Sequence, residues 1–253
     1  MRSFRAAAVG LALAACQKEP TGTVAGPPLT IAHDAGPSAT DAGLATPAFE
    51  PPVKASFVDV GASTPPVAAG PCDRVYVHVA RGKVDVAGES LSPGDTVVVS
   101  ATPSVPLRGA GVAVVVLAPR TPCPTTPGKT VVKGTVAPRL SWAFGTMSAH
   151  LDVGPPVSPD VYLGRLEGTA AVAEHVHATS WEILCALEAR GTFTLAGKER
   201  RLGDREIVVV PPDTKHAWKP DPGATLVGVQ IYDPPGPEQR FKLLAEQADA
   251  GPR

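Results

Sequence analysis

Three histidines and one glutamate in the carboxy-terminal half have the side chains and spacing best suited to chemistry: His175, His177, Glu182 and His216. His175 and His177 are two residues apart, and on a β-strand this spacing points both side chains to one face. Glu182 follows after a short turn, and a hairpin there would return its carboxylate over the same face. His216 would then come from a later strand end. The pattern predicts a single mononuclear metal site.

The ligand types also limit the metal. A set of three imidazole nitrogens and one carboxylate oxygen suits Mn, Fe, Co, Ni, Cu or Zn, and ligand type alone does not decide among these metals. We therefore expect one divalent transition metal as cofactor, with its identity left open.

Three further residues are candidate substrate contacts: Trp218, Arg165 and Gln230. Alternation from His216 directs Trp218 inward, whereas Trp181 adjoins Glu182 and is expected to face away from the site. Arg165 and Gln230 could meet an anionic substrate at the entrance, although surface solvation is the default for such side chains. No separate general base is identifiable.

The elements that must position these residues are strands. From residue 72 onward, short Val-rich runs alternate with Gly, Pro and Asp turns, and this pattern predicts an all-β fold. One helical pattern occurs at 238–248, where Phe241, Leu244 and Ala245 share one face after a Pro-rich step. We expect this short amphipathic helix to pack on the outside of the β-structure.

The β-rich part contains an internal repeat. Residues 82–88 match 191–197 at an offset of 109, and residues 91–99 match 202–210 at an offset of 111. A hairpin that is two residues longer in the second copy explains the change of offset. The chain therefore has two copies of one β unit.

The first copy lacks the ligand set. At these offsets the four ligand positions of the second copy correspond to Pro66, Ala68, Asp73 and Val105. His78 is the histidine of the first copy, and it aligns with Leu187, a core-strand position. We interpret His78 as a structural or surface residue.

The segment His-Val-His-x4-Glu, followed by Gly191 and by Val-Val-Val-Pro-Pro-Asp-Thr-Lys-His, resembles the two motifs of the cupin superfamily, G-x5-H-x-H-x3,4-E-x6-G and G-x5-P-x-G-x2-H-x3-N. The four ligand candidates match the motif ligands. The departures fall at turn positions: Gly168 is one residue early, and non-motif residues occur at Ala189, Arg205, Asp213 and Pro220.

The resemblance implies two double-stranded β-helix (jelly-roll) barrels in tandem, a bicupin. It further implies one divalent metal inside the second barrel, with coordination sites open to water or substrate. Two classes of function remain open, because this fold supports many activities. One is a metal-dependent oxygenase, decarboxylase or isomerase acting on a small oxygenated or carboxylated compound. The other is a non-catalytic module that binds a small molecule or a metal, or acts as a sensor.

The amino terminus resembles a bacterial lipoprotein signal. Arg2 and Arg5 precede a short apolar stretch, and Leu-Ala-Ala-Cys ends at Cys16. In the lipobox this cysteine is lipidated and becomes the new amino terminus; the alternative is an ordinary secretory signal in which Cys16 is incidental. Gln17 implies an outer-membrane destination in a Gram-negative host. We expect a lipid-anchored cell-envelope protein on the periplasmic face of that membrane.

Residues 17–70 are rich in Pro, Ala and Gly without hydrophobic periodicity, which predicts a disordered tether. The expected boundaries are then a signal peptide at 1–16, the tether at 17–70, a degenerate barrel at 71–124, a metal-binding barrel at 131–233, and a helix with tail at 234–253.

The remaining cysteines differ in their surroundings. Cys72 and Cys123 flank the first β-rich block, so a disulfide between them is plausible in an oxidising compartment. Cys185 lies in an apolar run and is expected to be a small buried core residue.

The charge balance excludes some partners. With 23 basic and 24 acidic side chains among 253 residues, the formal net charge is −1, which argues against nucleic-acid binding. Membrane contact is expected through the lipid anchor alone. The expected partner is a small-molecule ligand, and a homodimer is left open.

Overall fold

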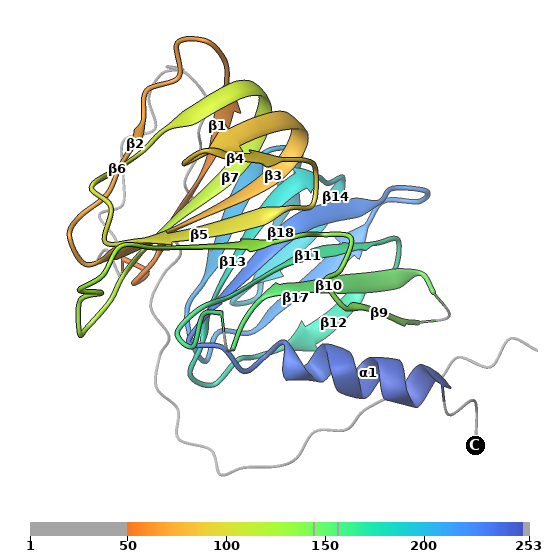
Figure 1. Ribbon diagram of the computed structural model, residues 1–253. Helices are drawn as coiled ribbons and strands as arrows, with labels where there is room; N and C mark the ends of the chain where they lie inside the picture. The colour runs from red at the N-terminus through yellow and green to blue at the C-terminus, as the bar shows by residue number, and fades with distance from the viewer. Residues whose placement is uncertain (1–49, 144, 156, 250–253) are drawn as a thin grey trace, which may run out of the picture.

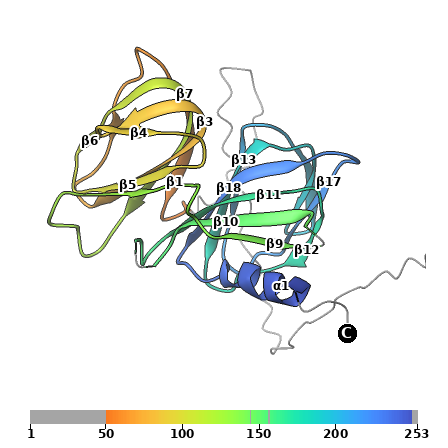
Figure 2. The same ribbon diagram turned by 45° about the vertical axis from the view of Figure 1, so that its right-hand side comes forward.

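Two β-barrels lie side by side in the computed structural model, which describes residues 50–143, 145–155 and 157–249 (Figures 1 and 2). The described part contains eighteen strands and one helix, α1 (Gln239–Asp249), at the end of the second barrel. This arrangement confirms the prediction of an all-β fold with two jelly-roll barrels and a short carboxy-terminal helix. The predicted signal peptide, Cys16 and residues 17–49 of the predicted tether lie outside the described residues.

Within the described residues, α1 is too short and too polar to cross a membrane.

The first barrel is built mainly from one sheet, in the order β1-β7-β3-β5-β8, with β4 paired to β3 and a small sheet of β2 and β6. Its interior is filled by aliphatic side chains, mostly valine. β-Branched residues suit this position because they pack well on a pleated surface. Its strands are β1 (Lys54–Val60), β2 (Val67–Ala68), β3 (Asp73–Val86), β4 (Glu89–Leu91), β5 (Thr96–Ser100), β6 (Ser104–Val105), β7 (Leu107–Pro119) and β8 (Gly128–Val132).

The predicted barrel boundaries at residues 71 and 131 are wrong. β1 pairs with β7 along its whole length, from Lys54 opposite Leu117 to Val60 opposite Gly111, so part of the predicted tether belongs to the first barrel. β8 pairs with β5 and also belongs to this barrel. Both are edge strands with exposed residues, and their weak hydrophobic pattern is hidden by Pro-rich neighbours.

The second barrel has one sheet in the order β16-β13-β18-β11-β10-β9 and another in the order β12-β17-β14-β15. Its strands are β9 (Arg139–Trp142), β10 (Met147–Val153), β11 (Tyr162–Gly168), β12 (Val172–His175), β13 (Trp181–Glu188), β14 (Gly191–Leu195), β15 (Lys198–Leu202), β16 (Glu206–Val210), β17 (His216–Pro220) and β18 (Leu226–Asp233).

The strand pairing shows the internal repeat. β3 pairs with β5 and β7 in the first barrel, as β13 pairs with β16 and β18 in the second. β2 pairs with β6 as β12 pairs with β17. The long β3 corresponds to β13 and β14 together, because the second copy breaks the strand between Glu188 and Gly191.

The two barrels share a hydrophobic core. Along β13 the side chains alternate, with Leu184 and Ala186 inside the second barrel and Ile183, Cys185 and Leu187 facing the first. The facing side chains of the first barrel include Phe57, Tyr76, Val98, Val114 and Val116. The prediction that Cys185 is a buried core residue is confirmed, and its place is between the barrels.

Ion pairs and one hydrogen bond between hydroxyl groups surround this shared core. They join the first barrel to the second at Arg74–Asp160 (2.8 Å), Arg81–Glu188 (2.7 Å), Arg120–Asp233 (3.3 Å), Asp59–Arg205 (2.8 Å) and Tyr76–Ser158 (2.8 Å). Exposed pairs of this kind contribute little individually to stability. Together they fix how one barrel is oriented on the other.

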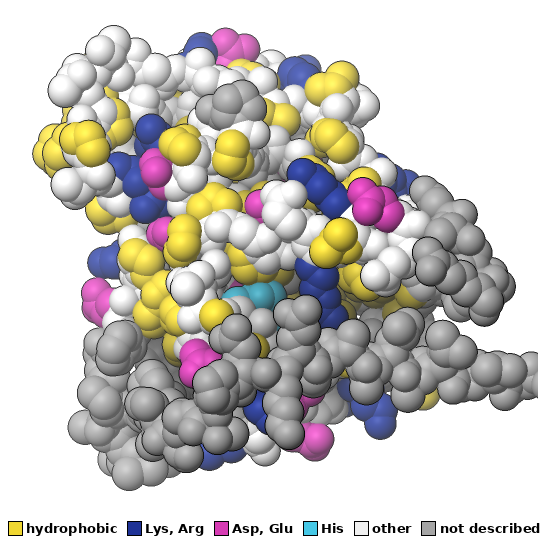
Figure 3. Space-filling model, turned by 90° about the horizontal axis from the view of Figure 1, so that it is seen from below, with side chains coloured by type: hydrophobic (Ala, Val, Ile, Leu, Met, Phe, Trp, Pro, Cys, Tyr) yellow, Lys and Arg dark blue, Asp and Glu magenta, His cyan; other side chains and the backbone are white. Residues whose placement is uncertain are grey.

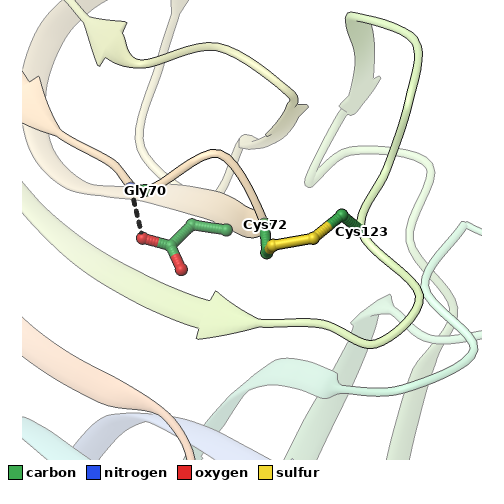
Figure 4. Close-up of a disulfide and its surroundings, with 4 residues drawn as sticks. Gly70, Cys72 and Cys123 are labelled. Atoms are coloured by element: carbon green, nitrogen blue, oxygen red, sulfur yellow. Dashed lines mark hydrogen bonds between the residues drawn. A yellow bond between two sulfur atoms is a disulfide. The ribbon is translucent and has the colours of Figure 1, made fainter.

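A disulfide joins Cys72 and Cys123, as the sequence suggested (Figure 4). It links the start of β3 to the segment after β7, and the Arg120 backbone N–H donates to the Cys72 carbonyl at 3.0 Å. Beside it, the Asp73 carboxylate accepts a hydrogen bond of 2.6 Å from the Gly70 backbone N–H. By closing a loop of the first barrel, the disulfide reduces the conformational entropy of the unfolded chain.

A buried polar pair lies between the barrels. His78 is 1% exposed and its Nδ1 is 2.9 Å from Thr96 Oγ1 and 3.7 Å from the carboxylate of Asp152. His78 is thus structural and not a surface residue. Neither carboxylate oxygen of Asp152 has a hydrogen-bond partner. Burial lowers the pKa of His78 to about 4 and raises the pKa of Asp152 to about 7, although nearby Arg165 opposes the second shift.

Replacing Asp152 should change how stability depends on pH. Because its folded-state pKa lies above the ordinary value of 3.8, the folded state favours the protonated acid, and stability is lost as pH rises through about 7. We expect Asp152→Asn to be more stable than wild type at pH 8.5, by about 2 kcal/mol or roughly 4–8 °C in Tm. This gain should be clearly smaller at pH 5, and it should vanish only below the ordinary value of 3.8. Urea unfolding at both pH values measures it.

The matched control is Asp85→Asn, at an exposed position of β3, which should show no pH-dependent difference from wild type. A gain for Asp152→Asn of equal size at pH 5 and pH 8.5 would contradict the assignment.

Candidate metal centre

The four predicted ligands converge at one point inside the second barrel. The ligand atoms of His175, His177, Glu182 and His216 all lie within 4.8 Å of one another. His175 ends β12 and is paired across the sheet with His216, the first residue of β17. His177 lies two residues beyond the end of β12, and Glu182 projects from β13. The sequence predicted that His216 comes from the end of a later strand, and this strand is β17.

Backbone carbonyls orient two of the imidazoles. The Nδ1 atom of His175 is 2.8 Å from the Ala173 carbonyl, and that of His216 is 2.9 Å from the Thr214 carbonyl. A carbonyl can only accept, so Nδ1 carries the hydrogen in both rings and Nε2 is left with its lone pair. Both rings thus present Nε2 as a ligand atom, an arrangement common at metal-binding histidines.

The carboxylate of Glu182 lies at the centre of the cluster and is 3% exposed. Its Oε2 is 2.9 Å from the Nε2 atoms of both His177 and His216, and its Oε1 accepts a 2.6 Å hydrogen bond from Gln230 Nε2. The Nε2 of His216 is buried and has no hydrogen-bond partner despite this short distance. A buried, unpartnered nitrogen among three other ligand atoms fits a shared cation.

Electrostatics leaves Glu182 and His175 in the protonation state that metal binding requires. Burial by itself would raise the pKa of Glu182, but the adjacent imidazoles of His177 and His216 hold it well below its ordinary value. Burial lowers the pKa of His175 to about 4. For His216, burial is outweighed by Glu182, which raises the pKa. At neutral pH Glu182 is therefore ionised and His175 neutral, which is the form that binds a metal.

Two of the departures from the motif glycines adopt glycine-like backbone conformations. Arg205 has φ of 60° and Asp213 has φ of 55°, a region that L-residues seldom occupy and Asp tolerates better than most. The backbone N–H of Asp213 donates to the carbonyl of His177 at 2.8 Å. The turn before His216 is thereby tied directly to the segment that carries the first two histidines.

Gly191 is required by close packing at the start of β14. A Cβ at this position would overlap Cη2 of Trp218 and backbone atoms of Lys219 and Pro220. The absence of a side chain lets the indole of Trp218 approach Gly191 closely, and Trp218 is 3% exposed. Trp218 is thus fixed beside the ligands.

A cavity of about 630 Å³ opens next to the cluster. Most of its wall is apolar, from Trp142, Met147, Leu166, Leu184, Phe193, Trp218, Leu226 and Tyr232. On the face seen in Figure 3, a histidine side chain is visible between hydrophobic side chains on one side and basic side chains on another. Histidine is thus exposed on that face.

The three candidate substrate contacts have different outcomes. Trp218 and Gln230 line the cavity, and the structure adds that Gln230 orients Glu182. Arg165 does not line the cavity and so is not brought together with the other two. It follows the inward-facing Gly164 on β11 and therefore points to the opposite face, where its guanidinium is 3.1 Å from Glu167. Trp181, expected to face away, is also absent from the cavity wall.

The helix packs on the outside of the second barrel, as expected, and its inner face also closes one wall of the cavity. Phe241 of α1 stacks on Trp142 of β9, with ring centroids 5.3 Å apart and planes inclined by 11°. Arg240, Phe241 and Leu244 line the cavity together with Pro237. The apolar face of the helix was visible in the sequence, but nothing in the sequence showed which surface it would cover.

The first barrel closes the corresponding position with aliphatic side chains. Val105, at the position aligned with His216, is fully buried in the valine-rich interior and is paired with Val67. Within the described residues, the closely spaced metal-ligand side chains all belong to the second barrel. The two copies thus differ in whether the interior is polar at this point.

Comparison with known proteins adds to this geometry. A protein-family model described as the quercetinase C-terminal cupin domain matches residues 64–117, which lie in the first barrel. No curated protein matches the sequence.

Several solved structures have a similar fold. An oxalate decarboxylase is 8% identical with a TM-score of 0.54, over 72% of this chain and 68% of that one. Vicilin from Corylus avellana (hazelnut) is 12% identical with a TM-score of 0.51, over 72% of each chain. Salicylate 1,2-dioxygenase from Pseudaminobacter salicylatoxidans is 13% identical with a TM-score of 0.50, over 76% and 75%. At these identities the similarity shows the fold alone. With a cupin-domain match in its first barrel and the repeated strand pairing in its second, the chain has the fold of two cupin barrels in tandem.

Proposed function

We propose that the second barrel binds one divalent transition metal and, beside it, a small molecule. The observation that carries this proposal is the convergence of three imidazoles and one carboxylate within 4.8 Å at the wall of an apolar cavity. A buried carboxylate and a buried, unpartnered imidazole nitrogen would be costly unless a cation used them. Pockets of this size hold small organic molecules.

The lining also bears on the chemistry. Apart from Glu182, no carboxylate, thiol or amine of the described residues lines the cavity. A bound divalent metal would supply Lewis acidity or, if it is redox-active, electron transfer to substrate or O2. The residues of the chain would hold the ion, shape the apolar wall and exclude water from it. The proposed activity is therefore metal-dependent oxygenation, decarboxylation or isomerisation of a small oxygenated or carboxylated compound.

The names of the similar structures are compatible with this range of activities and do not select one of them. One is an oxalate decarboxylase, one a salicylate dioxygenase and one a vicilin. A binding or sensor module without catalysis is the alternative that the experiments below separate.

We also propose that the protein is a lipoprotein of the cell envelope, anchored through Cys16. The support is the apolar stretch followed by Leu-Ala-Ala-Cys near the amino terminus. The Cys72–Cys123 disulfide agrees with an oxidising compartment.

Elemental analysis of the purified protein should find about one transition-metal ion per chain. His216→Ala should reduce this to below about 0.1 ion per chain, because the remaining three ligands no longer enclose the ion. Chelation should lower the Tm of wild type, since a ligand bound to the folded state stabilises it.

The control for this experiment is His150→Ala, a histidine of β10 outside the cluster, which should keep the metal. A metal content near zero in wild type, with the same Tm before and after chelation, would refute the metal site.

Turnover separates an enzyme from a binding module. We expect metal-loaded wild type to convert at least one compound in a panel of dicarboxylates, phenolics and thiols, and His175→Ala to lose that activity completely. Product formation is followed by chromatography. Saturable binding of a panel member without any conversion would favour the non-catalytic module.

Lipidation can be tested in cells with radiolabelled palmitate. Wild type should incorporate the label, Cys16→Ser should not, and Cys185→Ala, which leaves the lipobox intact, should incorporate it normally. Labelling that persists in Cys16→Ser would exclude this anchor.

A further inference from the structure

The cavity beside the ligands has one wall that no barrel strand supplies. This wall is α1, which lies across the end of the second barrel beside β9 (Figures 1 and 2). The stacking of Phe241 on Trp142 holds the helix there, and Phe241 is 8% exposed. The first turn of the helix then places Arg240 in the cavity lining.

Arg240 differs from most other arginines in the described residues. Eight of them form ion pairs with acidic side chains: Arg74, Arg81, Arg120, Arg139, Arg165, Arg200, Arg201 and Arg205. Arg108, Arg190 and Arg240 have no such pair within the part of the chain that the structure describes. Of these three, Arg240 lines the cavity.

Arg240 lines the same cavity as the ligands His175 and His216. Since no acidic side chain pairs with it, its donors remain available to an anion. A guanidinium binds a carboxylate through two parallel hydrogen bonds, which gives both affinity and orientation.

The rest of the wall restricts the class of anion. Among the described residues, it includes Trp142, Met147, Phe193, Trp218 and Leu226 and contains neither lysine nor a second arginine. A molecule with several charges would leave some of them unpaired against this apolar surface, which is costly. One anionic group and an apolar body match the lining.

We propose that Arg240 is the substrate-binding residue for an apolar monocarboxylic acid, whose carboxylate pairs with the guanidinium while its body lies against the aromatic wall. This inference rests on the proposed function of the same cavity. It makes α1 part of the binding site. The sequence suggested Arg165 as a contact for an anionic substrate, and we assign that role to Arg240 of this helix instead.

Calorimetric titration with simple probes tests the proposal. The probes are benzoate, cyclohexanecarboxylate and 4-methylpentanoate, with benzyl alcohol as the neutral analogue and phenyl phosphate as a second anion. Metal-loaded wild type should bind at least one carboxylate about ten-fold or more tightly than benzyl alcohol. Arg240→Gln should weaken that carboxylate by about ten-fold or more and leave benzyl alcohol and the metal content unchanged.

Two further variants make the result specific. Arg240→Lys keeps a positive charge and should retain part of the affinity, whereas Arg190→Gln removes an unpaired arginine outside this cavity and should change nothing. Circular dichroism and Tm of each variant check that the helix remains folded.

Three results would overturn the proposal: equal carboxylate affinity in wild type and Arg240→Gln, tighter binding of phenyl phosphate than of every carboxylate, or no binding of any probe carboxylate. Each titration is repeated after chelation, with the metal content measured separately. If the purified wild type contains no metal before chelation, the proposed metal function is refuted. If the carboxylate affinity is the same in wild type and Arg240→Gln, this inference alone is refuted.

Discussion

Strand β13 is buried on both faces, and this constraint fixes the position of the metal-ligand cluster and the packing of the two barrels. Glu182, Leu184 and Ala186 face the interior of the second barrel, while Ile183, Cys185 and Leu187 pack against the first barrel. A shift of register by one residue would exchange these two sets and bury the carboxylate of Glu182 between the barrels without a partner. The shared core therefore holds Glu182 in the position where the three histidines meet it.

This constraint gives the ligandless first barrel a structural role. Its own interior is closed by valines, including Val105 at the position of a ligand, and its outer face covers the sheet that carries Glu182 and Gln230. Duplication thus provides one copy that is stabilised by aliphatic packing and one that tolerates a polar centre. The polar centre is tolerated because most of its buried groups are held by one another or by backbone carbonyls, and the bound cation that we propose would satisfy the Nε2 atom of His216.

Much of the site could be predicted because its signals are local. The residue types and short spacing of His175, His177 and Glu182 are visible in the sequence, although His177 lies beyond the end of β12, and strand alternation correctly placed Cys185 and Trp218. The barrel boundaries could not be predicted as well, because β1 and β8 are edge strands whose stability comes from pairing with β7 and β5. Their own residues carry little hydrophobic pattern.

The sequence by itself determined the all-β class, the duplication and the four ligand-type side chains, since residue type and short spacing suffice for these. Only the tertiary structure decided that Gln230 orients Glu182, that Arg165 faces away from the cavity, and that α1 brings Arg240 into it. These facts depend on which strands and helices become neighbours. That choice is made by packing between residues distant in the chain, and no local pattern records it.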